Sequence, residues 1–397
     1  MPFVMIKSVR LVNFFSFGDC TIELEPDLNV LVGVNGSGKS NLLRAFQLLK
    51  AGINGRLQEQ VAQWGGLNSI HPKNLVRPII HRQIEVAFTL SVDVIGPWKD
   101  GYEDDIVYRI VLLGNANDFT VDEVVERPDG QRYFDSLGGS IFASAIAIVE
   151  RTGITRRKLG NGKELLVPTL AFEEAFGESS FIRFHLGGLD VYKAFNTIEE
   201  APMRTAVRAT GIDKLLPNGD NVFQVLNVTS LKSAPDYDAI EAGLQDVNEQ
   251  FQRFRMNVYG QGSVEFYLQE KGLDTPIHAA QVSDGTLCYL CLLVALYQPE
   301  RGRVTVFDEP ERNLHPDMLV ELGKQLEKAS KRRQIILTTH APGLLNQFPL
   351  RAVRVFEKDE YNQTQVRQFT EADFAGWYEE FAPGQMWRDG ALGGNRY

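Results

Sequence analysis

The stretch Gly33-Val-Asn-Gly-Ser-Gly-Lys-Ser40 matches the phosphate-loop pattern, in which four residues separate the first glycine from a Gly-Lys-Ser/Thr triplet. Its glycines allow successive backbone N–H groups to point at phosphate oxygens, and the helix that follows adds its positive N-terminal end. Apolar residues 28–32 precede the loop, and an amphipathic pattern covers residues 37–50. The sequence therefore predicts a strand, a phosphate-binding loop and a helix in that order.

Each residue type in this loop has an expected task toward a bound nucleotide. Lys39 would reach the β- and γ-phosphates of ATP, and the Ser40 hydroxyl would ligate Mg²⁺. A glycine-rich turn that matches by chance is the alternative, but the flanking strand and helix make it the weaker one. The residues expected to bind nucleotide here are Asn35, Gly36, Ser37, Gly38, Lys39, Ser40 and Asn41.

A second apolar run, residues 303–307, ends in the acid pair Asp308 and Glu309. In α/β sheets, ligands bind at the carboxyl edge of the strands, which is where these two carboxylates would lie. Asp308 suits a place beside Mg²⁺, and Glu309 suits the polarisation of an attacking water. The plainer alternative is a solvated strand end.

Two further segments point to the same chemistry. Residues 335–339 predict a third apolar strand, which would bring His340 to the same edge to donate a hydrogen bond to a γ-phosphate. The segment 281–286, which contains Ser283 and Gly285, lies at the start of a predicted helix over 285–297. Ser283 is a natural helix N-cap, and the same hydroxyl and free N–H groups can face an anion. Taken alone, an incidental polar contact for His340 and a simple cap for Ser283 are the commoner interpretations.

The rest of the chain supports an α/β fold with an inserted middle. Strand–helix alternation at both ends favours a sheet with parallel pairings. Cys288 and Cys291 form a CxxC pair with no second pair or nearby histidine, so we expect them in the core rather than in a zinc site. Other expected strands cover 83–90, 105–113, 122–126, 263–269 and 352–357, expected helices cover 238–254 and 318–330, and residues 151–167 suggest a hairpin.

Composition bounds the class of protein. The chain has 397 residues, of which 44% are hydrophobic and 23% charged, which excludes disordered and fibrous classes. No apolar window is long enough for a membrane span, no signal peptide is expected, and three cysteines are too few for a disulfide framework. These features predict a soluble cytoplasmic protein with no membrane partner. The net charge of −10 argues against non-specific coating of nucleic acid, although a local basic patch stays open.

In this order the four motifs resemble the ABC-class ATPases of the SMC/RecF/OLD-like group. Residues 9–17 followed by 29–41 are similar to the start of that group's members. Residues 308–316 resemble its acid-pair motif and D-loop, and residues 339–342 resemble its switch-histidine segment. The motifs cover about residues 1–50 and 280–345.

The resemblance implies an α/β fold, namely a P-loop ABC-type ATPase head with a mixed β-sheet and an inserted α+β subdomain. The implied division is 1–90 and 261–397 for the two parts of the head and 91–260 for the insertion. It also implies a homodimer that sandwiches two ATP molecules with Mg²⁺. Ser283 and Gly285 of one subunit would contact the γ-phosphate held by Lys39 of the other. Glu309 would act as the catalytic base and His340 as the γ-phosphate sensor.

The chain also departs from the patterns it resembles. Phe15 stands where members of the group often carry arginine, and Asp284 stands where transport ABC proteins have glycine. The chain between Ser40 and Ser283 is too short for the long coiled coil of SMC proteins, and the segment after His340 is too short for an appended nuclease domain.

Three functions remain open from the sequence. The first is an ATP-driven dimerisation switch acting on duplex DNA in repair, chromosome maintenance or defence against phage. The second, ranked close to it, is a nucleotide-sensing scaffold that holds or releases an effector protein, such as a nuclease or toxin, without binding DNA itself. A transporter engine is the weakest, because the Ser283-Asp-Gly segment departs from the transport signature.

Overall fold

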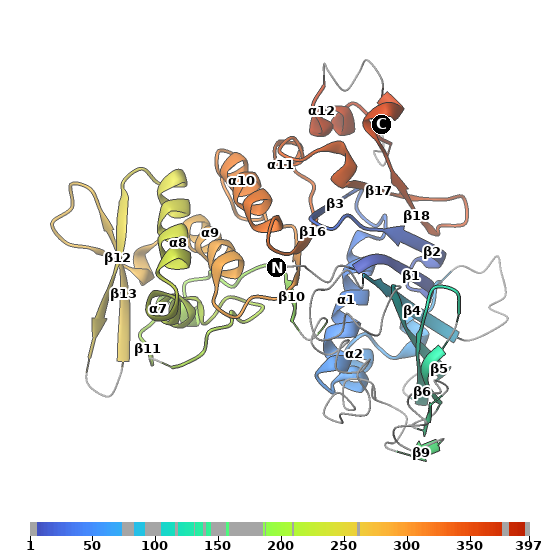
Figure 1. Cartoon of the computed structure of the whole chain (residues 1–397). Helices are drawn as coiled ribbons and strands as arrows, with labels where there is room; N and C mark the ends of the chain where they lie inside the picture. Colours follow the sequence, from blue (N-terminus) through green and yellow to red (C-terminus); the bar gives the residue numbers. More distant parts are fainter. Residues whose placement is uncertain are drawn as a thin grey trace.

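The computed structural model contains three β-sheets with helices packed against them (Figure 1). The hairpin expected over 151–167 lies outside the described residues, except that 156–158 form a short strand. The described residues are 6–73, 83–91, 105–115, 118–130, 132–137, 140–143, 156–158, 186, 188–208, 210–259, 263–374 and 381–393.

The central sheet confirms the α/β prediction. Its first five strands are parallel to their neighbours, and only the last pairs antiparallel. Every residue of β3 and β16 is buried, as expected for parallel strands covered on both faces. In spatial order the strands are β10 (Leu189–Tyr192), β15 (Val304–Asp308), β16 (Gln334–Thr338), β3 (Leu28–Val32), β17 (Val353–Lys358) and β18 (Thr364–Gln368).

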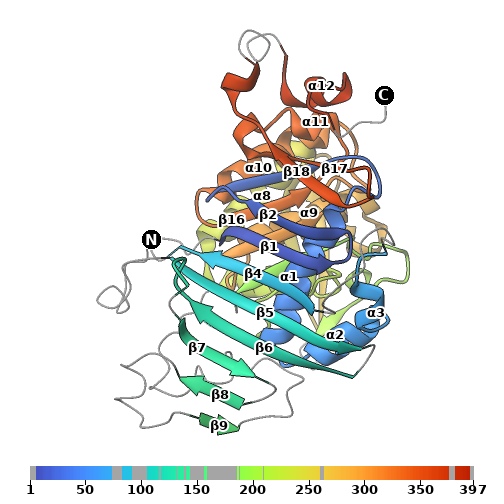
Figure 2. The same cartoon turned by 90° about the vertical axis from the view of Figure 1, so that its right-hand side faces the viewer.

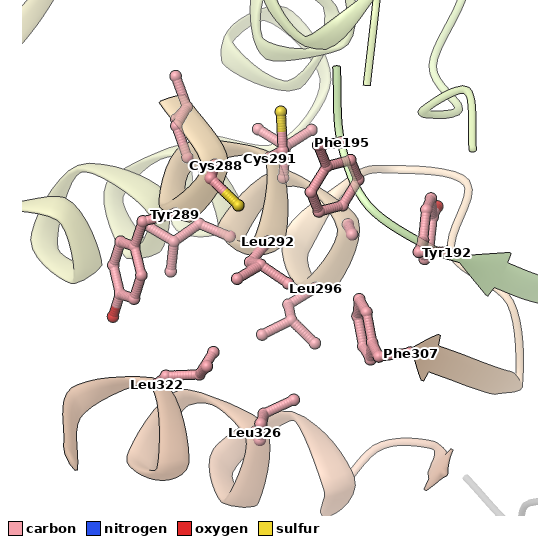
Figure 3. Close-up of a cluster of buried hydrophobic side chains, with 14 of the residues drawn as sticks. Tyr192, Phe195, Cys288, Tyr289, Cys291, Leu292, Leu296, Phe307, Leu322 and Leu326 are labelled. Carbon is pink, nitrogen blue, oxygen red and sulfur yellow. The ribbon is translucent and has the colours of Figure 1, made fainter. Parts of the chain in front are cut away.

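Different helices cover the two faces of this sheet, because side chains alternate along each strand. Leu31 of β3 lies in one hydrophobic cluster with the apolar side of α1 (Lys39–Ile53). Val30 and Val32 lie in a second cluster with α9 (Asp284–Tyr297) and α10 (Met318–Ser330). Figure 3 shows α9 and α10 meeting in that second cluster. Cys288 and Cys291 are buried there, so both are core residues as predicted.

A second, antiparallel sheet packs on the α1 side (Figure 2). It joins the N-terminal hairpin to a meander of later strands. Its strands are, in order, β2 (Phe17–Glu23), β1 (Ile6–Phe14), β4 (Gln83–Leu90), β5 (Ile106–Asn115), β6 (Asp118–Glu126), β7 (Arg132–Leu137), β8 (Ser140–Ala143) and β9 (Arg156–Lys158).

A third, smaller sheet lies at the opposite end of the molecule from the meander (Figure 1). It is formed by β11 (Val207–Arg208), β12 (Phe251–Val258), β13 (Ser263–Glu270) and β14 (Ile277–His278). Beside it, α7 (Val222–Lys232) and α8 (Ala234–Val247) pack against α9.

The helix expected over 238–254 is wrong in its C-terminal part. The helix α8 ends at Val247, and Phe251 and Phe254 belong to β12. Their spacing of three suits a helix face, but both rings become buried through pairing with β13, a long-range contact that outweighs the local pattern.

The segment 91–260 contributes strands to all three sheets among the described residues, and its assignment as an inserted subdomain remains a prediction. No helix in the described ranges is long and apolar enough to cross a membrane. The remaining short elements are α2 (Leu57–Gln63), α3 (Leu67–Ile70), α11 (Pro342–Leu345), α12 (Pro383–Arg388) and the 3-10 turns Pro202–Arg204, Ala279–Gln281, Leu350–Ala352 and Glu371–Phe374.

Candidate nucleotide site

The phosphate loop connects the end of β3 to the start of α1, as predicted. Gly36 and Gly38 have φ angles of 83° and 115°, which favour glycine. A Cβ on Gly38 would lie 2.2 Å from Thr364 Oγ1, and one on Gly33 would lie 2.4 Å from the carbonyl oxygen of Phe356. The backbone therefore approaches its neighbours too closely for any side chain at these two positions.

Lys39 is buried and folds back over the loop. Its Nζ donates hydrogen bonds to the carbonyl oxygens of Gly33 at 2.7 Å and Val34 at 3.2 Å. Burial lowers the pKa of Lys39 to about 8, although the nearby carboxylates of Glu309 and Asp308 oppose that shift. The ammonium is thus held where a phosphate oxygen could replace the carbonyls as its partner.

Two residues that the sequence did not single out brace the loop from distant parts of the chain. Thr364, at the start of β18, donates from its hydroxyl to the carbonyl oxygen of Ser37 at 2.7 Å. Ser16, in the turn between β1 and β2, lies 2.7 Å from that hydroxyl and accepts a bond from Asn41 Nδ2 at 2.7 Å. No local pattern marks Ser16 or Thr364, since their role arises from contacts more than 300 residues apart.

The acid pair lies at the end of β15, beside the end of β16. Thr338 Oγ1 donates to Asp308 Oδ1 at 2.8 Å and accepts from the backbone N–H of Glu309 at 2.9 Å. Glu309 has a φ of 52°, an uncommon conformation for a side-chain-bearing residue and one often found at functional sites. Its Oε1 lies 3.3 Å from Nε2 of His340. The structure thus brings together the two residues predicted to be catalytic.

The environment of His340 favours its neutral form. Burial is the largest cause that lowers its pKa, the Lys39 charge lowers it further, and Glu309 and Asp308 act in the opposite direction. A neutral imidazole can donate a single hydrogen bond while keeping its second nitrogen as an acceptor.

Glu311 supports this arrangement, although its place in the motif predicts no separate role for it. It accepts hydrogen bonds from Thr339 Oγ1 at 2.7 Å and from the backbone N–H of His340 at 2.9 Å. Burial raises the pKa of this carboxyl. Its position three residues after Asp308 in the acid-pair segment is the signal that could have identified it.

Mg²⁺ is compatible with the residues predicted to hold it. Ser40 is exposed at the start of α1 and Asp308 is half-buried at the end of β15. Magnesium sites in nucleotide-binding proteins use one or two protein oxygens together with phosphate oxygens. The described residues contain no group of three or more His, Cys, Asp or Glu side chains that could hold a metal ion by themselves.

The Ser283 segment lies on the other face of the central sheet from α1. Ser283 caps α9 as predicted, because its Oγ accepts from the N–H of Thr286 at 3.2 Å. It is exposed, and no hydrogen bond in the described ranges joins it or Gly285 to the phosphate loop. A Cβ on Gly285 would lie 3.2 Å from the carbonyl oxygen of Asn313, so the start of α9 contacts the segment after the acid pair.

Arg204 fixes the loop that leads to Ser283, although no motif predicts a role for it. Its side chain is 6% exposed and donates to the carbonyl oxygen of Val282 at 2.7 Å and to Asp284 Oδ1 at 2.5 Å. It also donates to the carbonyl of Thr197 at 2.9 Å and to those of Ile198, Ala279 and Ala280.

A pocket of about 570 Å³ lies next to the phosphate loop and is lined in part by Ser16 and Asn41. The Arg44 guanidinium lies 4.4 Å from the centre of the Phe15 ring, and Phe15 packs edge-on against Trp64. Arg44 thus brings a cation to the Phe15 ring beside the phosphate loop.

Comparisons with known proteins agree with this geometry. The family model described as "AAA domain, putative AbiEii toxin, Type IV TA system" matches residues 156–346, and "AAA ATPase domain" matches residues 5–95. The "DNA replication and repair protein RecF" of Clostridium botulinum (strain Loch Maree / Type A3) is 30% identical over 120 residues, 28% of this chain and 30% of that protein. The RecF of Moorella thermoacetica (strain ATCC 39073 / JCM 9320) is 36% identical over 67 residues, 16% of this chain and 18% of that protein. The chain thus matches less than a third of the length of these relatives.

Two solved structures have a similar fold. The SMC head bound to the C-winged helix domain of ScpA has a TM-score of 0.57 at 14% identity, covering 94% of this chain and all of that one. The second is the Smc head domain with an extended coiled coil bound to the C-terminal domain of ScpA, derived from Pyrococcus furiosus. Its TM-score is 0.53 at 13% identity, and the match covers 95% of this chain and 99% of that one. The fold and the motifs together define a P-loop fold of the ABC-type ATPase class. Within that class, the chain is similar to RecF proteins over part of its sequence and to SMC heads in its fold.

Proposed function

We propose that this ATPase works as an ATP-dependent dimerisation switch. The observation that carries the proposal is the position of the Ser283 segment, exposed at the start of α9 on the opposite face of the sheet from α1. A serine hydroxyl and free N–H groups at a helix N-terminus suit a phosphate. In this position they suit a phosphate held by a second copy of the chain, with two copies arranged head to tail around two ATP molecules.

The residues at the phosphate loop have separate tasks in this proposal. Lys39 pairs with the phosphates, while Ser40 and Asp308 hold Mg²⁺, which neutralises charge on the β- and γ-oxygens when bound. Glu309 accepts a proton from the attacking water. His340, whose Nε2 lies 3.3 Å from Glu309 Oε1, would donate its single N–H to the γ-phosphate when nucleotide is bound.

The segment after the acid pair links the two halves of the proposed site. Glu311 holds the backbone of His340, and the Cys288 Sγ of α9 lies 3.4 Å from the carbonyl oxygen of Arg312. A change at the γ-phosphate would therefore reach α9, the helix that Ser283 caps, through residues 309–313. We propose that this connection makes dimerisation depend on the nucleotide.

The variant Glu309→Gln tests the switch. It keeps the shape of the site but removes the base, so the protein should bind ATP and accumulate as a dimer by light scattering. Adding Ser283→Arg should return the ATP-bound protein to a monomer, because the larger side chain blocks the contact between copies. A Glu309→Gln protein that stays monomeric at saturating ATP contradicts the proposed sandwich.

We further propose that the switch acts in DNA repair, chromosome maintenance or phage defence through a partner. The RecF relatives support a role on DNA, and the family description that names a toxin system supports defence. A scaffold that controls a nuclease or toxin is the second candidate, and the net charge of −10 favours it, since wrapped DNA prefers a basic surface. Mobility-shift titration with duplex DNA, with and without ATP, separates the two, and absence of binding at low salt in every nucleotide state supports the scaffold.

A further inference from the structure

A second pocket, of about 620 Å³, shares Gln63 and Trp64 with the pocket beside the phosphate loop. Its walls come from the C-terminal half of α1, from α2, and from the segments that follow β10 and precede α7. Figure 1 shows α1 and α2 together, with β10 beside them. None of the residues predicted to bind ATP or Mg²⁺ lines this pocket.

Three basic side chains line this pocket, those of Lys50, Arg56 and Lys193, and we call it the basic pocket. Among the described residues, Glu59 is the one acid that lines the pocket, and it accepts a hydrogen bond from Gln63. Within the described ranges, the ends of the three cationic side chains form no ion pair or hydrogen bond. Three unpaired positive charges around one cavity favour a ligand with more than one negative oxygen.

Lys50 is the most enclosed of the three cations. Burial lowers its pKa, the Asp190 carboxylate opposes that shift, and the Lys214 charge adds to it. Binding an anion would offset the cost of holding this ammonium away from water.

Other lining residues suit a nucleobase. The half-buried Trp64 indole, fixed edge-on against Phe15 at 5.5 Å, offers a flat apolar surface. Four side-chain amides line the same pocket, those of Gln47, Asn54, Gln60 and Asn218. The last three each donate one hydrogen bond within the chain and keep a second N–H for a ligand. Cations together with an aromatic platform and amides are the combination that binds nucleotides in single strands.

We propose that the basic pocket binds a nucleotide unit, a phosphoester carried beside a base, at a site separate from the phosphate loop. The unit could come from a free nucleotide or from a single strand of nucleic acid, which offer the same chemistry. The net charge of −10 repels polyanions at long range, so binding would depend on these local cations. This proposal does not rest on ATP hydrolysis or on dimerisation.

The test compares two charge-reversal pairs in the full chain. Arg56→Glu with Lys193→Glu removes two cations of the pocket, and both residues are exposed, so the fold should be retained. Arg208→Glu with Lys331→Glu is the matched control, since both are exposed, lie outside the pocket and change the net charge equally. The probe is a fluorescein-labelled oligothymidylate of about 12 nucleotides, long enough for one binding site and followed by anisotropy.

We expect the pocket pair to weaken oligothymidylate binding at least tenfold and the control pair to change it less than twofold. The slope of log affinity against log salt should fall by about 1.4, the value for two lost phosphate contacts on a single strand. Competition with dCMP distinguishes the sources. If dCMP displaces the labelled oligothymidylate at concentrations near that of the oligonucleotide, the ligand of the basic pocket is a free nucleotide. If dCMP fails to displace it, the ligand is a single strand.

Two results overturn the proposal. One is the absence of binding of either probe at about 50 mM salt, where phosphate contacts are strong. The other is an equal loss of binding in the pocket and control pairs. ATP turnover measured on the same variants should remain within twofold of the unchanged protein, so failure at the basic pocket is distinguishable from failure of the proposed switch.

Discussion

Replacing Arg204 with methionine should loosen the loop that presents Ser283. The substitution keeps an unbranched apolar stem but removes every donor that joins residues 197–198 to residues 279–284. The carbonyl oxygens left behind lose their charged partner, and Asp284 loses its ion pair.

The magnitude follows from the burial of the two partners. Removing one member of a buried charged pair costs about 3–5 kcal/mol. The Asp284 side chain is 63% exposed and becomes hydrated again, so we expect the lower end, about 3 kcal/mol. Asp284→Ala removes only one bond from an exposed acid and should cost about 1 kcal/mol or less. Arg204→Lys should fall between them, because an ammonium cannot reproduce the planar fork of the guanidinium.

Hydrogen exchange read by mass spectrometry measures this opening directly. Amides of residues 280–287 should exchange about a hundredfold faster in Arg204→Met, the factor that 3 kcal/mol corresponds to, and less than tenfold faster in Asp284→Ala. Arg301→Met, which breaks the paired bonds to Asp236 at 2.8 Å, is the control and should leave these amides unchanged. Equal exchange in Arg204→Met and Asp284→Ala would refute the reasoning, and so would an effect of Arg301→Met on the same amides.

Three further predictions concern the phosphate loop and the acid pair. Lys39, with a pKa of about 8, is charged below that pH and neutral above it, so nucleotide affinity should fall about tenfold from pH 7 to pH 9. Fluorescent-nucleotide titration checks this, and Lys39→Arg should show a flat profile. Thr338→Val removes the hydroxyl that holds Asp308, and should lower the turnover number about tenfold with little change in nucleotide affinity; a change in affinity alone contradicts this role. Gly38→Ala places a Cβ 2.2 Å from Thr364 Oγ1 at a φ of 115°, and should abolish nucleotide binding by calorimetry, whereas unchanged binding would show that the loop adapts.

The central sheet was predictable because its strands carry strong local signals. Residues 28–32 and 334–338 are apolar runs that end in recognisable motifs, and they form β3 and β16 with nearly the expected bounds. The strand β10 was missed because it has only four residues and includes Asp190. That carboxylate is 1% exposed, accepts a hydrogen bond from the Gly302 N–H at 2.7 Å and forms an ion pair with Lys214 at 2.9 Å, partners that no local pattern shows.

The same distinction applies to the site. Lys39, Glu309 and His340 lie in motifs whose spacing carries the chemistry, so their grouping could be predicted from the sequence. Arg204 and Thr364 act through bonds to backbone carbonyls of distant segments, and a carbonyl is present at every residue. The identity of such partners depends on the folded chain and leaves no trace in sequence spacing.

The position of β3 between β16 and β17 also determines when the protein can fold. Leu28 pairs with Ile335 and Val30 pairs with Val353. About 300 further residues must therefore be synthesised before this fully buried strand can pair with its neighbours. At the usual rate of translation that delay is roughly 15 to 60 s, during which an apolar strand has both edges unpaired. A nascent chain shorter than 364 residues carries the phosphate-loop sequence but lacks the hydroxyl that braces it. We therefore expect the phosphate loop to take its final form late in synthesis, and the ribosome-bound chain to depend on chaperones that hold extended apolar segments.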